Sequence, residues 1–107
     1  MRIELLWFEG CPNHEAARRA LEGVLASRGL DAATIQFVQV DRESAEALRF
    51  PGSPTIRVDG RDIEPAFRDA GSYSLSCRVY QTSSGPRGTP PIEWIERAID
   101  AAASRRD

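Results

Sequence analysis

Apolar residues near the N-terminus form one short, nearly continuous run, followed by a stretch with helical spacing. The run covers residues 3–8 (Ile-Glu-Leu-Leu-Trp-Phe) and is typical of a strand covered on both faces. Apolar side chains then recur at helical spacing over residues 16–25, and Gly29 closes the predicted helix. Cys11-Pro12 opens this helix, because proline is favoured at the first helical position. The β-branched, apolar residues 34–40 predict a second strand.

The middle of the chain predicts a short helix and then a β-hairpin. Asp41 or Ser44 can cap the helix, because both are favoured N-cap residues. Asp59-Gly60 separates two short alternating runs, residues 55–58 and 61–63. Asp-Gly in that setting is a strong signal for a tight hairpin turn.

The last third of the chain combines an irregular segment with a helix. Residues 66–90 are rich in Ser, Gly and Pro and predict a long irregular loop, interrupted by Cys77-Arg78-Val79-Tyr80. A loop of this length in a small domain is typically functional or disordered. A last helix is predicted to start at Thr89-Pro90-Pro91, with Arg105 and Arg106 in its final turn, where cations favour the helix dipole.

The predicted element order is β-α-β-α-β-β-α, which places the chain in the α/β class. Right-handed crossovers set the second strand parallel to the first, and helices flank a four-stranded mixed sheet. We expect residues 1–107 to form one domain, since a chain of this length buries enough surface for one core. Trp7 and Trp94 are interpreted as core residues.

Composition and charge narrow the function classes. The net charge of −2 provides no basic field, which argues against nucleic acid or an anionic membrane as the partner. No run approaches the roughly 18 apolar residues that span a bilayer. Glu4 interrupts the apolar start and no cleavage site follows, so we expect no signal peptide and a cytoplasmic location. Two cysteines in such a protein indicate thiol chemistry or metal binding more than a structural disulfide.

Two short motifs, taken with the element order, resemble the thioredoxin superfamily. Cys11-Pro12 follows the first strand and Ser53-Pro54-Thr55 precedes the third. The resemblance covers roughly residues 2–65 and 90–104, judged by element order rather than identity. Residues 8–13, 52–58 and 77–80 further resemble a group of small bacterial thioredoxin-like proteins. The resemblance implies a thioredoxin-like fold.

The resemblance also implies roles for particular residues. Cys11 matches the nucleophilic cysteine, Pro12 the residue after it, and Pro54 a cis-proline. The backbone of Ser53 would then be an edge that pairs with an extended substrate. A dithiol enzyme carries its second cysteine at position 14, where this chain has His14. A helix N-terminus favours the thiolate form of a cysteine, which is the nucleophile.

Several residues near this site have two interpretations. His14 either supplies a positive charge or accepts a proton, or it is a solvated surface residue. Cys77 is either a resolving cysteine, since its segment begins at the end of the sheet where Cys11 lies, or a small buried apolar residue. Arg78 and Arg87 either bind a carboxylate, such as that of glutathione, or are solvated charges.

These observations favour a thiol oxidoreductase in which Cys11 attacks a disulfide or mixed disulfide of a protein or small molecule, with Cys77 resolving the intermediate. The protein would be a monomer or weak homodimer, and no motif indicates a bound cofactor or resident metal. One alternative is a metal- or mercurial-binding protein that uses Cys11 and Cys77, with or without His14. Another is a redox-inactive thioredoxin-fold interaction domain.

Overall fold

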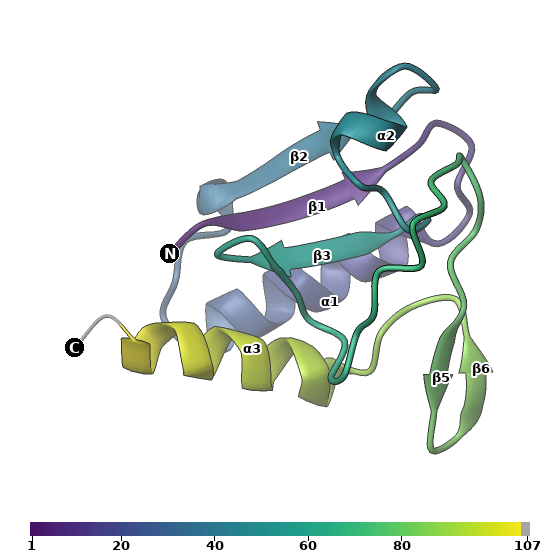
Figure 1. Ribbon diagram of the computed structural model, residues 1–107. Helices are drawn as coiled ribbons and strands as arrows, with labels where there is room; N and C mark the ends of the chain where they lie inside the picture. The colour runs from purple at the N-terminus through teal and green to yellow at the C-terminus, as the bar shows by residue number, and fades with distance from the viewer. Residues whose placement is uncertain (106–107) are drawn as a thin grey trace.

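A four-stranded sheet with helices on both faces forms the centre of the computed structural model, which describes residues 1–105 (Figure 1). The elements in chain order are β1 (Ile3–Trp7), α1 (His14–Ser27), the 3-10 turn η1 (Ala32–Thr34), β2 (Ile35–Gln39), α2 (Ser44–Ala47), β3 (Thr55–Val58), β4 (Arg61–Asp62), β5 (Tyr80–Thr82), β6 (Gly85–Arg87) and α3 (Ile92–Arg105). The strand order is β2-β1-β3-β4, with β1 parallel to β2 and antiparallel to β3. The predicted mixed α/β sheet is therefore confirmed.

The central strand β1 is buried on both faces, as its apolar run predicted. Ile3 and Leu5 face α1 and α3, whereas Leu6 faces α2. The fully buried members of the larger cluster from the two long helices include Ala17, Leu21, Leu25, Ile95 and Ala102. Because successive side chains of a strand alternate between faces, an apolar run without alternation can fill both cores.

The two long helices begin later than the sequence predicted. Asn13 is the N-cap of α1, and its carbonyl accepts the Ala17 N–H at 3.1 Å. Cys11-Pro12 belongs instead to the turn before the helix, in which the Cys11 N–H donates to the Phe8 carbonyl. The last helix begins at Ile92. Arg105 lies in its final turn, whereas the predicted Arg106 lies outside the described residues. Within residues 1–105 no helix has the length and apolar character to cross a membrane.

The prediction of an irregular segment over residues 66–90 is wrong for its second half. Strands β5 and β6 pair as an antiparallel hairpin that projects beside the start of α3 (Figure 1). The Thr82 hydroxyl holds its turn by donating to the Gly85 carbonyl and accepting the Ser84 N–H. Three-residue strands, one of them containing Pro86, are too short to give a strand pattern in the sequence.

Candidate functional site

Cys11 lies where β1 runs into α1, at one end of the sheet. Its residue surface is 5% exposed, and it stands two positions before the N-cap Asn13. The Asn13 side chain makes no capping hydrogen bond, so it satisfies none of the free N–H groups in the first turn of α1. These groups and the helix dipole favour negative charge at the start of the helix. The later helix start thus leaves Cys11 near the positive end of α1, although outside the helix itself.

His14 holds the turn around Cys11 through three contacts. Its ring stacks on Trp7, with centroids 4.3 Å apart and planes 12° apart. Nδ1 lies 3.2 Å from the Cys11 carbonyl oxygen, to which it can donate, and Nε2 lies 3.0 Å from Glu15 Oε1. Both ring nitrogens therefore face oxygen atoms, and the contact with Cys11 is made to its backbone. This geometry suits a positioning residue, and a direct role in proton transfer stays a prediction.

The Ser53–Pro54 peptide bond is cis, as the sequence predicted, and it leads directly into β3. The Tyr80 hydroxyl donates a hydrogen bond to the Pro54 carbonyl. Burial raises the pKa of Tyr80, the Arg78 charge lowers it, and Cys11 is among the nearby groups that raise it. The Tyr80 hydroxyl is thus held protonated as a donor to the Pro54 carbonyl.

Cys77 is placed beside Ser53 by a short stretch of parallel pairing. The Ser53 N–H donates to the Ser76 carbonyl at 2.9 Å, and the Ser53 carbonyl accepts the Arg78 N–H at 2.9 Å. Paired backbones of this kind lie about 5 Å apart. Cys77 is exposed and both thiols are free, so the interpretation of Cys77 as a buried apolar residue is wrong. The Ser53 edge, predicted to be open for a substrate, is filled by the chain itself.

Glycine at position 52 allows this close approach. Gly52 has φ +132°, and a Cβ there would lie 3.0 Å from the Arg78 Cβ and 3.2 Å from the Ser76 carbonyl oxygen. Any larger residue would combine backbone strain with a contact tighter than ordinary packing. The lack of a side chain at Gly52 therefore lets residues 76–78 pack closely against the Gly-Ser-Pro sequence.

Arg78 anchors that segment to the edge of the sheet. Its guanidinium makes two hydrogen bonds to Asp62, at 2.6 and 2.9 Å, and one of 2.8 Å to Glu64. It also donates to the Thr55 hydroxyl and lies 4.3 Å from the centroid of the Tyr80 ring. Burial lowers the pKa of Arg78, but the bonds with these carboxylates raise it above its usual value.

The sequence interpretations of Arg78 are therefore corrected. The residue is only 6% exposed, so it is not a solvated charge, and its donors are already bound to carboxylates, so it is not free for a ligand. Sequence reasoning missed its partners Asp62 and Glu64 and the role of Tyr80. Their only local signal is a pair of acidic residues two positions apart at the end of the predicted hairpin.

The buried Ser53 hydroxyl yields a stability prediction, because its Oγ has no hydrogen-bond partner among residues 1–105. Ser53→Ala should raise the free energy of unfolding by about 1 kcal/mol, since an unsatisfied buried hydroxyl is removed. Thr55→Val is the matched control, because the Thr55 hydroxyl bonds to Gly52 and Arg78 and its loss should destabilise by about 1–3 kcal/mol. Urea unfolding measures both. Equal destabilisation by the two substitutions would show that Ser53 has a partner.

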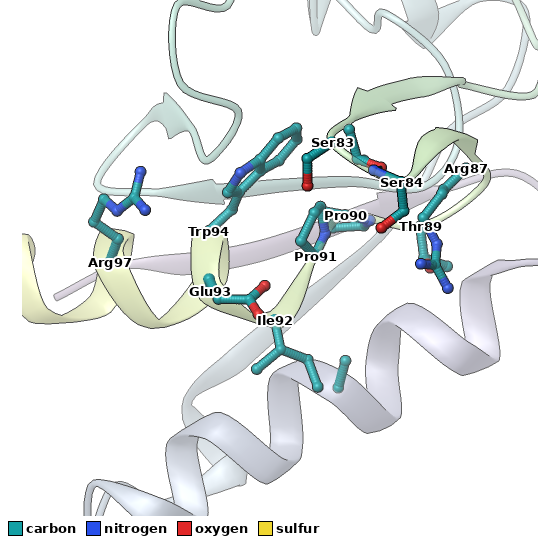
Figure 2. A pocket seen from close by; sticks show the side chains of 12 residues that line it. Ser83, Ser84, Arg87, Thr89, Pro90, Pro91, Ile92, Glu93, Trp94 and Arg97 are labelled. Atoms are coloured by element: carbon teal, nitrogen blue, oxygen red, sulfur yellow. The ribbon is translucent and has the colours of Figure 1, made fainter.

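The remaining candidate features lie apart from the thiols. Arg87 is exposed and lines a groove between the β5–β6 hairpin and the start of α3, together with Trp94 and Arg97 (Figure 2). Neither cysteine lines this groove. Among residues 1–105, no three His, Cys, Asp or Glu side chains are grouped so that they could hold a metal ion.

No protein-family model, curated protein or solved structure matches this chain. The function must therefore be inferred from the side chains themselves. Cys11 before α1 and Cys77 beside Ser53 and Pro54 lie at the same end of the sheet.

Proposed function

We propose that this chain is a thioredoxin-like thiol–disulfide oxidoreductase, with Cys11 as nucleophile and Cys77 as the second thiol. One observation carries the proposal: the pairing of Cys77 with Ser53 brings a second free thiol to the end of the sheet that holds Cys11. The sheet order β2-β1-β3-β4, with α1 and α3 on one face and α2 on the other, supports the fold assignment. The cis-proline before β3 supports it further.

In the first step, the Cys11 thiolate attacks one sulfur of a substrate disulfide R–S–S–R. A Cys11–S–S–R bond forms, the substrate S–S bond breaks, and R–S⁻ leaves and takes a proton from solvent. Cys11 precedes the start of α1, where the helix dipole favours negative charge, and His14 fixes the turn that carries Cys11.

In the second step, the Cys77 thiolate attacks the Cys11 sulfur. The Cys11–Cys77 bond forms, the second R–S⁻ leaves, and the substrate has been reduced by two electrons while the protein has been oxidised by two. A dithiol reductant restores the two thiols by the reverse exchange. Cys77 suits this step because it is exposed and its pairing with Ser53 holds it at the end of the sheet where Cys11 lies.

The experiment uses Cys77→Ser to separate the two steps. Reduced Cys77→Ser protein, mixed with 2-hydroxyethyl disulfide, should accumulate one stable mercaptoethanol adduct on Cys11, because no second thiol resolves it. The wild-type protein should carry this adduct only transiently. Quenched samples are followed by intact mass, and a digest assigns the adduct. An adduct of equal lifetime in both proteins would contradict the role of Cys77, and absence of any adduct on Cys11 would contradict the proposed function.

A further inference from the structure

The 76–78 segment fills the one main-chain edge beside Pro54 that an extended substrate would need. Polypeptide substrates that bind in extended form add a strand to an open edge, through main-chain hydrogen bonds. Here the N–H and the carbonyl of Ser53 are both bonded to the 76–78 segment, each at 2.9 Å. A polypeptide substrate could pair with Ser53 only by displacing this segment.

Displacing the segment would break more than those two hydrogen bonds. The buried Arg78 side chain bonds to Asp62 and Glu64, and the Asp62 side chain is itself only 3% exposed. Pulling Arg78 away would leave a buried carboxylate without its partner, which is strongly unfavourable. Two residues further on, Tyr80 is fully buried and bonded to Pro54. The buried side chains of Arg78 and Tyr80 therefore anchor the 76–78 segment.

Access of a substrate to Cys11 is also restricted, because this residue is itself buried. The residue is 5% exposed, so a bulky disulfide cannot approach its sulfur without local movement. A small disulfide needs no strand pairing and requires a smaller opening. The filled edge and the buried thiol independently favour the same class of substrate.

We infer that the substrates of Cys11 are low-molecular-weight disulfides, and that the anchored 76–78 segment excludes extended polypeptide disulfides. This inference rests on the proposed function and specifies its substrate class. The reaction is the exchange already described: the small disulfide R–S–S–R gives the Cys11–S–S–R adduct and one free thiol, and Cys77 then releases the second thiol.

The test compares two probes in the Cys77→Ser background, where only the first step occurs. One probe is 2-hydroxyethyl disulfide. The other is the symmetric disulfide of an unstructured peptide with a single cysteine, so that attack on either sulfur gives the peptide adduct. Formation of the small adduct should be at least about tenfold faster than formation of the peptide adduct, since two main-chain hydrogen bonds must be broken to admit the peptide. Intact mass distinguishes the two adducts.

Two kinds of variant test whether the segment is the cause. Asp62→Asn combined with Arg78→Met removes both charges of the buried pair, and should raise the peptide rate about tenfold while the small-disulfide rate changes less than about twofold. Gly52→Ala should act in the same direction, because its Cβ pushes against Arg78. The matched control is Arg49→Met with Asp69→Asn, which removes an ion pair between an exposed arginine and a loop aspartate. Amide hydrogen exchange at Ser53 and Arg78 reports release of the segment.

The outcomes separate this inference from the proposed function. The inference is supported if the small adduct forms faster than the peptide adduct, and if this difference in rate disappears in the Asp62/Arg78 variant and in Gly52→Ala but remains in the control. Equal rates for both probes in the Cys77→Ser protein without further substitutions would overturn the inference and leave the proposed function standing. So would unchanged discrimination in variants whose Ser53 and Arg78 amides exchange faster. A Cys11 that reacts with neither probe would overturn the proposed function and the inference together.

Discussion

Replacement of Cys11 by serine should abolish the reaction of position 11 with disulfides. We expect the rate of adduct formation at this position to fall at least about a thousandfold, because a serine hydroxyl is not ionised near neutral pH and does not exchange with disulfides. The measurement is the rate of adduct formation with 2-hydroxyethyl disulfide, followed by intact mass and assigned to position 11 or Cys77 by a digest. Serine is close to cysteine in size, so the fold around the buried site should be kept, and circular dichroism checks this.

Cys77→Ser is the matched control for that result. It should keep the first step at a rate within about threefold of wild type, because the role proposed for the exposed Cys77 is to resolve the adduct. If Cys11→Ser protein formed adducts as fast as wild type through Cys77, the assignment of the nucleophile to Cys11 would be wrong.

Removal of the Arg78 side chain should have the largest effect on stability. Arg78→Ala leaves the buried Asp62 carboxylate and its neighbour Glu64 without their partner, and it should lower the free energy of unfolding by about 3–5 kcal/mol. Urea unfolding at neutral pH measures this loss.

Arg49→Ala is the comparison for this prediction. Arg49 bonds to Asp69 as closely as Arg78 bonds to Asp62, but its side chain is 68% exposed. Exposed ion pairs contribute about 0–1 kcal/mol, so this variant should unfold nearly as wild type does. A similar loss in the two variants would contradict the view that the buried network anchors the 76–78 segment.

The parts of the fold predicted from sequence are those with local signals. The apolar run of residues 3–8 has no alternation, which is why it indicated a strand buried on both faces, and β1 is that strand. Asp59-Gly60 lies between alternating residues and forms the predicted turn, because these two types tolerate the positive φ found at both positions. The cis bond before Pro54, by contrast, was implied by the resemblance of Ser53-Pro54-Thr55 to the thioredoxin superfamily.

The parts that were missed depend on contacts distant in sequence. Arg78 is separated from Asp62 by 16 positions, and nothing local distinguishes a buried, paired arginine from a solvated one. The pairing of Ser53 with the 76–78 segment likewise joins distant residues through backbone groups, which leave no mark on residue type. The start of α1 was misplaced because Pro12 suits the first helical position, whereas Asn13 takes the N-cap.

The most direct test of the proposed thiol pair is a disulfide map of the oxidised monomer. Reduced wild-type protein is treated with excess 2-hydroxyethyl disulfide at low protein concentration, alkylated and digested without reduction. The proposed function predicts an intact monomer lighter by two hydrogens and a linked peptide that joins Cys11 to Cys77. Two separate, stable mercaptoethanol adducts, or a dimer linked through Cys77 with Cys11 unmodified, would contradict it.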